Sequence, residues 1–298
     1  MSQGLWRRRD CLKALLLAPL AFSRDLYAQP LATDRIVAIN WAAAELMLTL
    51  GITPLAISDS GYFRRRIPDP VLPAVVRDIG PYWEPNLEYL AQLRPSLILS
   101  DALSPSILTA LARIAPVEVV NIYPAEGDAW QSLCDWLLPL AARLNRLAQA
   151  QQLLDAASQH LADLRQQLAT RARPKVCVAV LNQDGKHATV YGQHSLVQCV
   201  LDRLGLVNAW QQPGNRIGLA NVSIDRLATL ADTRLFYSEL PTTADRLRKA
   251  RQSSALWQHL PLVQQGDAVP LPPFFPFGGV RTALRLADSL ALRLLSEP

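Results

Sequence analysis

Apolar runs of strand length alternate along the chain with segments of helical spacing, which is the pattern of an α/β protein. Residues 34–40 form a strand-like apolar run, and residues 43–50 continue with helical spacing up to Gly51, a residue that commonly ends a helix. The pattern therefore predicts a strand, a helix and a turn at the start of the folded part.

A similar order of elements occurs twice. Residues 86–93 and 223–230 each read as a helix with an acidic residue near its start, and strand-like runs follow at 97–101 and 234–239. Leu-Gly pairs also close helical stretches in both halves, at Leu50 and Leu204. We expect two α/β lobes of related design. Coincidence between ordinary amphipathic helices is the alternative.

A long helix is predicted between the two halves, at residues 145–171. Leucines recur there every seven residues, and the segment contains no Gly or Pro. A helix of this length would extend roughly 40 Å, which is long for one lobe. We expect it to join the lobes, giving an N-terminal lobe at 33–143, a backbone helix at 144–172 and a C-terminal lobe at 173–298. A coiled-coil dimer is the weaker alternative.

The N-terminus has the features of a signal peptide. Basic residues 7–9 precede the apolar stretch 14–22, and Ala28 offers a small residue before a cleavage site. The stretch is too short for a membrane-spanning helix, and Arg8-Arg9-x-Cys-Leu-Lys is similar to the twin-arginine export motif. We expect residues 1–28 to direct export to the periplasm; a basic start of a cytosolic protein is the alternative.

Removal of this segment changes the charge. The remaining chain has 25 basic and 23 acidic groups, a net charge of +2, which gives no case for nucleic-acid binding. Its cysteines are expected to be buried apolar residues, with a disulfide as the alternative, and its histidines lack metal-ligand spacing. The cysteines are Cys134, Cys177 and Cys199, and the histidines are His160, His187, His194 and His259.

Enzyme motifs are missing from the sequence: it has no nucleophile elbow, dinucleotide fingerprint, phosphate loop or zinc-protease motif. Asp184, His187 and Ser195 could suggest a hydrolase, but a surface loop explains them more simply. We therefore expect a binding protein and not an enzyme.

With these features the chain resembles the FhuD-like periplasmic proteins that deliver ferric siderophores to ABC importers. The resemblance extends from about Asp34 to Leu295. It rests on Arg35-Ile-Val-Ala, Glu45-Leu-x-Leu-x-Leu-Gly-Ile, Glu84-Pro-Asn-Leu-Glu88, Ala112-Arg-Ile-Ala-Pro116, Asn208-Ala-Trp210 and Val222-Ser-Ile-Asp-Arg-Leu227.

The resemblance implies two α/β lobes joined by one backbone helix, with a shallow cleft and limited hinge motion. It implies a ferric siderophore as the ligand and an inner-membrane ABC permease as the partner. The siderophore would hold the iron itself, so we expect no cofactor and no metal ligands from the protein. We also expect a monomer.

A ferric siderophore calls for aromatic walls and a few polar or cationic groups, placed on loops at strand ends. Core packing is the alternative for Trp41 and Trp210, and a solvated basic loop is the alternative for residues 64–66. Turns around Tyr82 and Trp83 make their burial in a core difficult, so we expect both to contact the ligand. The full set of candidates is Trp41, Tyr62, Arg64, Arg66, Tyr82, Trp83, Trp210, Asn215, Arg216, Phe275, Phe277 and Arg281.

Several positions depart from the family pattern. The resemblance implies Arg at the position of Tyr82, Tyr near Ser104, and aromatic residues at Arg66 and Ile217. Hydroxamate binding follows from the resemblance, but extra arginines would also suit a carboxylate or citrate-type chelate. Haem stays open too, since Tyr82 could serve as an axial ligand.

Two acidic residues, Glu88 and Asp225, occupy corresponding places in the two halves. In the family that the chain resembles, such acids meet arginines of the permease. Stabilisation of a helix N-terminus by a nearby carboxylate is the alternative for both.

Overall fold

The computed structural model describes residues 35–123, 127–171, 174–182, 184–230, 232–239 and 254–296. The predicted signal peptide, residues 1–28, lies outside the described residues. Residues 31–298 belong to one unit of the chain, and the following description concerns that unit alone.

The first lobe is built on a parallel sheet of five strands in the order β3-β2-β1-β4-β5. β1 pairs with β2 on one side and β4 on the other, with Val37 opposite Ala56 and Ile98. This order makes the gap between β1 and β4 the place where the direction of winding reverses. The strands are β1 (Ile36–Ala38), β2 (Ala56–Ile57), β3 (Arg77–Asp78), β4 (Leu97–Ser100) and β5 (Val117–Val119).

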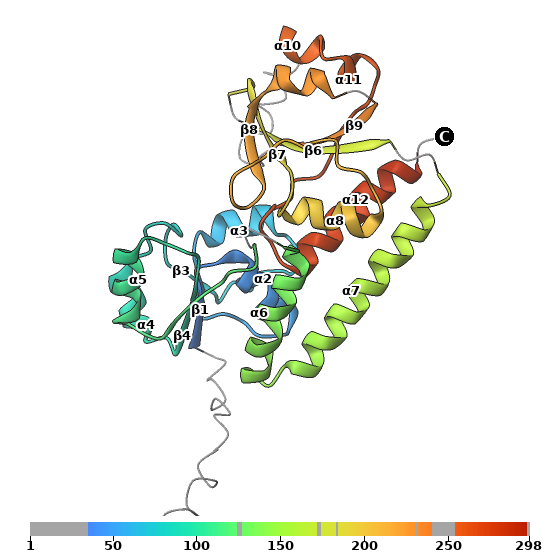
Figure 1. Cartoon of the computed structure of the whole chain (residues 1–298). Coiled ribbons are helices and arrows are strands. Elements are labelled where there is room, and N and C mark those ends of the chain that lie inside the picture. Colours follow the sequence, from blue (N-terminus) through green and yellow to red (C-terminus); the bar gives the residue numbers. More distant parts are fainter. Residues whose placement is uncertain are drawn as a thin grey trace, which may run out of the picture. The chain divides into compact units, whose positions relative to one another are not determined.

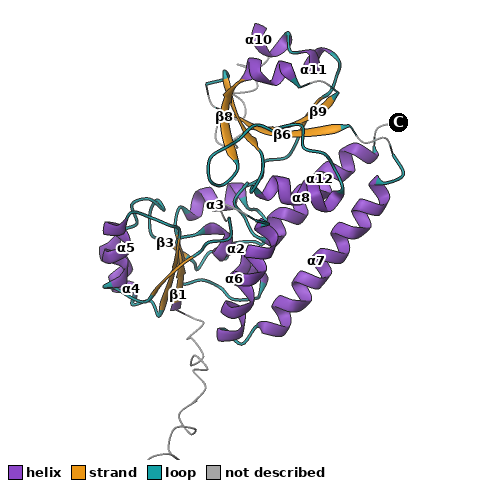
Figure 2. Cartoon of the chain, viewed as in Figure 1, coloured by secondary structure: helices purple, strands orange, loops and turns teal. Residues whose placement is uncertain are grey.

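Helices connect these strands and cover the sheet (Figures 1 and 2). Asn40 caps the first of them by accepting a hydrogen bond from the Ala43 amide at 2.9 Å, and Gly51 follows its end with φ at 74°. The helices of this lobe are α2 (Trp41–Thr49), α3 (Ser60–Arg66), α4 (Leu87–Leu93), α5 (Pro105–Ala112) and α6 (Ala129–Arg143).

The second lobe has a mixed sheet in the order β10-β9-β6-β7-β8, in which β6, β9 and β10 are parallel and β7 is antiparallel to both of its neighbours. Its strands are β6 (Lys175–Leu181), β7 (His187–Tyr191), β8 (Leu219–Ser223), β9 (Thr233–Glu239) and β10 (Ala268–Pro270). Its helices are α8 (Leu196–Leu204), the 3₁₀ helix η2 (Ile224–Thr229), α10 (Ala255–Gln258), α11 (Pro261–Gln264) and α12 (Val280–Leu295).

The long helix of the sequence prediction is α7, Leu147–Leu168. Its predicted apolar seam is buried from Ala150 to Leu168, although Leu147 at its start is half exposed. α7 packs against α6, α8 and α12, and α12 packs in turn against α2 of the first lobe (Figure 1). The lobes are therefore joined by two helices, α7 and α12. The sequence analysis assigned the segment of α12 to the C-terminal lobe alone, whereas α12 also packs against the first lobe.

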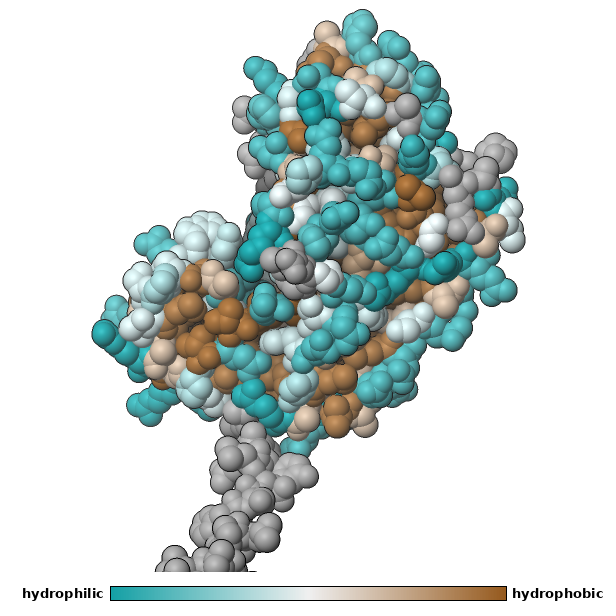
Figure 3. Space-filling model, viewed as in Figure 1, coloured by the Kyte–Doolittle hydropathy of each residue, from teal (hydrophilic) through white to brown (hydrophobic). Residues whose placement is uncertain are grey.

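One apolar cluster reaches from Ile36 of β1 through Leu154 of α7 to Phe236 of β9, so the two lobes share a core. Motion of one lobe against the other would expose part of this cluster, which favours limited hinge motion. In the part of the chain that the structure describes, no helix is long and apolar enough to span a membrane. Polar and apolar side chains both appear on the face drawn in Figure 3.

Most local predictions are confirmed. The strand and helix at 34–50, the helix at 86–93 and the strands at 97–101 and 234–239 are present. The helix predicted at 223–230 is the six-residue 3₁₀ helix η2, Ile224–Thr229, with Asp225 in its first turn. Cys177 and Cys199 are buried, as expected, and Cys134 is half-buried.

One prediction of local structure is wrong. Residues 64–66 were expected on a loop, but they form the last turn of α3. Arg64 and Arg65 are exposed, whereas Arg66 is only 6% exposed. Cationic side chains in the last turn of a helix interact favourably with its dipole.

Candidate ligand-binding cavity

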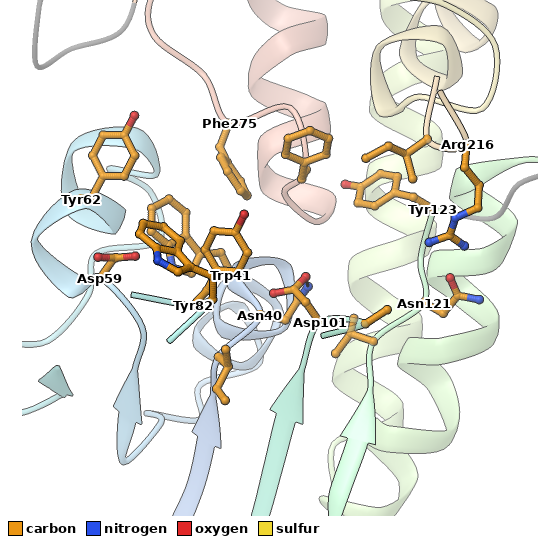
Figure 4. Close-up of a pocket in the computed structure, with 16 residues that line it drawn as sticks. Asn40, Trp41, Asp59, Tyr62, Tyr82, Asp101, Asn121, Tyr123, Arg216 and Phe275 are labelled. Atoms are coloured by element: carbon orange, nitrogen blue, oxygen red, sulfur yellow. Dashed lines mark hydrogen bonds between the residues drawn. The ribbon is translucent and has the colours of Figure 1, made fainter. Parts of the chain in front are cut away.

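A cavity of about 550 Å³ opens at the carboxyl ends of the first sheet. Each strand of the sheet contributes a residue that follows it closely in sequence (Figure 4). These residues are Asn40 after β1, Asp59 after β2, Tyr82 after β3, Asp101 after β4 and Asn121 after β5. Parallel strands bring their carboxyl ends to one edge of a sheet, and binding sites of α/β proteins form at that edge.

The second lobe supplies the opposite wall. Arg216 and Ile217 come from the segment between α8 and β8, and Phe275 and Phe277 come from the segment between β10 and α12. Figure 4 shows Arg216 and Phe275 on the opposite side of the cavity from the strand ends of the first lobe. The cavity therefore lies between the two lobes, where a ligand would contact both.

Aromatic rings form a continuous wall. The Trp41 ring lies 4.9 Å from Phe275, Phe275 lies 5.5 Å from Phe277, and Phe277 lies 6.1 Å from Tyr123, all between ring centroids. The Trp41 indole donates a hydrogen bond of 2.9 Å to the Ser58 carbonyl, which fixes its orientation. Trp41 is only 7% exposed, so it both packs in the core and lines the cavity.

Tyr82 and Trp83 lie at the cavity and not in a core. Their rings are perpendicular at 5.0 Å between centroids, and they remain 45% and 57% exposed. The sequence predicted this exposure from the turns on both sides of the pair. Rings left in water beside a cavity offer apolar surface to a ligand.

Two carboxylates face the cavity. Asp101 accepts a hydrogen bond of 2.6 Å from the Asn40 amide, and burial raises its pKa while that hydrogen bond lowers it. Burial also raises the pKa of Asp59, and the nearby Asp78 carboxylate adds to this, although the Tyr82 backbone N–H donates to Asp59 and opposes it. The raised pKa values mean that the cavity disfavours the charged forms of Asp59 and Asp101.

Arg216 is the cationic residue among the described residues that line the cavity. It is exposed, and Figure 4 places it beside Asn121, on the far side of the view from Asp59. One guanidinium against two carboxylates does not make a basic pocket. Arg64, Arg66 and Arg281, the other arginines predicted for the site, do not line this cavity.

Arg66 does not line the cavity but contacts residues that form its aromatic wall. Its guanidinium donates to the Phe274 carbonyl at 2.9 Å and to the Tyr62 hydroxyl at 3.2 Å, and it lies 5.9 Å from the centre of the Phe275 ring. Phe274 is 208 residues away in sequence, so Arg66 ties α3 to the second lobe. Arg64 instead donates to the Pro73 carbonyl at 3.3 Å.

Three further candidates lie outside the cavity. Trp210 is 3% exposed and packs in the core of the second lobe, so core packing, the alternative given for it, is correct. The Asn215 carboxamide accepts from the backbone amides of Ile217 and Leu219 at 3.1 and 3.0 Å, which shapes the turn that carries Arg216. Arg281 is an exposed residue in the first turn of α12.

The sequence search missed several residues of the cavity because it considered mainly aromatic and cationic types. Asn40, Asp59, Asp101, Asn121 and Tyr123 line the cavity and were not predicted. Four of them are short polar residues directly after an apolar strand, which is a signal that the sequence does contain.

A buried carboxylate connects the two lobes close to the cavity. Glu45 of α2 is fully buried and accepts hydrogen bonds from the Thr282 hydroxyl at 2.6 Å, the Thr282 amide at 3.0 Å and the Gly279 amide at 3.1 Å. Burial raises its pKa, and these donors oppose the rise. The Tyr123 hydroxyl donates to the Gly278 carbonyl at 2.5 Å, next to this contact.

Comparison with known proteins identifies the family. A family model described as periplasmic binding protein matches residues 36–273. The chain belongs to the periplasmic binding protein family.

Relatives within the family carry more specific names. The chain is 34% identical over 296 residues to the iron(3+)-hydroxamate-binding protein FhuD of Escherichia coli K12, covering 95% of each chain. It is 24% identical over 238 residues to the Fe(3+)-citrate-binding protein YfmC of Bacillus subtilis, covering 78% of this chain and 71% of that protein.

A solved structure of similar fold is that of the Fe³⁺–Desferal-bound siderophore-binding protein FhuD from Vibrio cholerae. It has a TM-score of 0.81 and 28% identity, and the match covers 89% of this chain and 99% of that one. The predicted fold of two α/β lobes and the predicted resemblance are therefore confirmed.

Proposed function

We propose that this protein is the periplasmic component of an ABC importer that captures a ferric siderophore of the hydroxamate class. The observation that carries the proposal is the cavity between the lobes, with its aromatic wall and with one arginine against two aspartates. The 34% identity to an iron(3+)-hydroxamate-binding protein supports it. A cavity of about 550 Å³ is within the usual range for small-molecule sites.

The charge of the cavity selects between siderophore classes. A ferric ion held by three singly charged hydroxamates forms a neutral chelate, whereas ferric catecholate and citrate complexes are anionic. An anionic chelate would lie against Asp59 and Asp101 with Arg216 as the compensating cation. Bringing like charges together in a partly buried site is unfavourable, so a neutral chelate fits better.

The siderophore itself would supply the ligands of the iron. Among the described residues there is no group of three His, Cys, Asp or Glu side chains that could hold a metal ion. The aromatic wall would contact the organic shell of the chelate, and Asn40, Asn121 and Arg216 would donate hydrogen bonds to its oxygen atoms. The protein would bind and release its cargo without catalysis.

Delivery would require contact with a permease. Glu88 and Asp225 are both exposed, at the start of α4 and of η2, one in each lobe. We propose that these carboxylates dock on basic residues of an inner-membrane permease, with the protein acting as a monomer after export by residues 1–28. Opposite charges on two surfaces speed their association and fix their orientation.

A titration tests the proposed function. Trp41 and Trp83 line the cavity, so a bound ferric chelate should quench tryptophan emission in a saturable way. We expect a neutral ferric trihydroxamate to bind more tightly than ferric citrate, a ferric catecholate or haem. Tighter binding of an anionic chelate would overturn the hydroxamate class, and the absence of quenching by any of them would overturn the function.

A further inference from the structure

One end of the cavity combines a carboxylate with aromatic rings. Asp59 is the N-cap residue of α3, and Figure 4 draws its carboxylate on the same side of the cavity as Trp41, Tyr62 and Tyr82. All four residues line the cavity. The Tyr62 and Trp41 rings are 5.6 Å apart between centroids, so this end has a defined aromatic surface.

No basic side chain of the described residues forms an ion pair with Asp59. The three arginines of α3 lie near it in sequence but are directed elsewhere: Arg66 to the Phe274 carbonyl, Arg64 to the Pro73 carbonyl, and Arg65 over the Tyr62 ring at 5.5 Å. The Tyr82 backbone N–H is the hydrogen-bond donor that the structure gives to this carboxylate.

Asp101 likewise forms no ion pair among the described residues. Its carboxylate already accepts a 2.6 Å hydrogen bond from Asn40, a side chain that is itself buried. Both carboxylates keep acceptor capacity, so what distinguishes Asp59 is that it shares its end of the cavity with the aromatic rings of Trp41, Tyr62 and Tyr82. Burial and the neighbouring Asp78 raise the pKa of Asp59, and a bound cation would offset both effects.

A carboxylate together with aromatic faces is suited to an alkylammonium group. The Trp41 and Tyr82 rings can attract a cation through their negative faces, and the carboxylate provides a charge-assisted hydrogen bond. The Tyr62 ring already faces the guanidinium groups of Arg65 and Arg66, at 5.5 and 5.6 Å from its centre. Neutral hydroxamate oxygens would gain nothing from this combination, because they are hydrogen-bond acceptors like the carboxylate itself.

We propose that the Asp59 end of the cavity binds an ammonium arm of the siderophore, so that the protein prefers ferric hydroxamates that carry a primary amine. This inference rests on the proposed function and specifies the substrate class of the same cavity. The chelate body would contact the wall of Phe275 and Phe277, and the arm would reach Asp59 between Trp41 and Tyr82.

The test compares two chelates that differ at one terminal group, which is a charged primary amine in one and a neutral acetamide in the other. The first is the ferric complex of Desferal, a linear trihydroxamate that ends in a primary amine, and the second is the same complex after N-acetylation. Isothermal titration calorimetry of the purified protein should give about tenfold tighter binding of the amine form. A tenfold change in Kd is what one charge-assisted hydrogen bond contributes in a partly open site.

Asp59→Asn should reduce affinity for the amine form about tenfold and leave the acetylated form unchanged, because Asn removes the charge and keeps the shape. Asn also tolerates the left-handed backbone at this position, where φ is 44°, so the fold should be retained. Asp155→Asn removes the same charge from the exposed face of α7 and serves as the matched control, with no expected effect on either chelate.

Each failure has a distinct meaning. Equal affinity of the wild-type protein for both chelates, or an unchanged preference in Asp59→Asn, would overturn the inference and leave the proposed function standing. Loss of the preference in Asp101→Asn but not in Asp59→Asn would overturn the assignment to Asp59. Failure of the wild-type protein to bind either chelate would overturn the proposed function and the inference with it.

Discussion

The contact between Glu45 and the start of α12 should contribute strongly to stability. The Glu45 carboxylate is fully buried and accepts three hydrogen bonds, two from Thr282 and one from the Gly279 amide. The donors lie at the N-terminus of α12, where backbone amides have no partner within the helix. Replacing Glu45 by Ala leaves these donors without their acceptor.

The magnitude follows from the hydrogen bonds that are lost. A buried donor left unsatisfied costs about 1–3 kcal/mol, so three donors give a loss of about 3–9 kcal/mol in the free energy of unfolding. For a chain of this size the loss corresponds to a fall of about 6 °C or more in Tm. Thr282→Val removes the 2.6 Å hydroxyl bond alone and should cost about 1.5–3 kcal/mol.

Urea unfolding followed by tryptophan emission, together with calorimetry, measures both quantities. Glu84→Ala is the matched control, since Glu84 is exposed and such surface substitutions change stability by about 0.5 kcal/mol or less. The double variant Glu45→Ala/Thr282→Val should cost less than the sum of the single variants, because they share one hydrogen bond. A loss below about 1 kcal/mol in Glu45→Ala would refute the reasoning.

Three other predictions concern binding, transport and pH. Trp83→Ala should weaken binding of the ferric chelate about tenfold and change Tm by about 1–2 °C at most, because the ring is largely exposed; normal affinity would contradict a role at the cavity. Glu88→Ala combined with Asp225→Ala should leave chelate affinity unchanged and abolish iron uptake, so normal growth on the ferric siderophore would exclude docking through these residues. The Arg203 hydrogen bond at 2.8 Å, together with that of the Trp130 amide, outweighs burial and lowers the pKa of Asp128. A lowered pKa stabilises the fold above the unfolded value of about 4 and this contribution is lost at lower pH, so Asp128→Asn should lower Tm at neutral pH and converge with the wild type at about pH 2–3.

Local structure could be predicted because it depends on neighbours in sequence. The apolar run at 34–40, the helical spacing at 43–50 and the terminating Gly51 are sufficient to define β1, α2 and the turn after them. The seven-residue spacing of leucines likewise predicted α7, since a helix buries one stripe whatever its partner is. Exposure of Tyr82 and Trp83 followed from turns on either side of them.

Assembly of the cavity depends on strand order, which the sequence pattern does not contain. Asn40, Asp59 and Asp101 are separated by many residues and meet only because β2, β1 and β4 are neighbours in a parallel sheet. Short polar residues after strands are common, so the type of residue alone did not mark them as members of a site. The alternation of strands and helices predicted a binding site at the carboxyl-terminal edge of a sheet. The order of the strands in the sheet decided which side chains lie at that edge.

Tertiary structure also decided which arginines and tryptophans line the cavity. The sequence offered both Arg66 and Arg216 as ligand-binding candidates. Arg66 donates hydrogen bonds to the Phe274 carbonyl and the Tyr62 hydroxyl and does not line the cavity, whereas Arg216 does. Trp210 is buried and Trp83 exposed for the same reason: burial is set by packing partners that are distant along the chain. The sequence by itself thus determined the elements and the two-lobed class of fold, and only the folded chain determined the charge and the lining of the cavity.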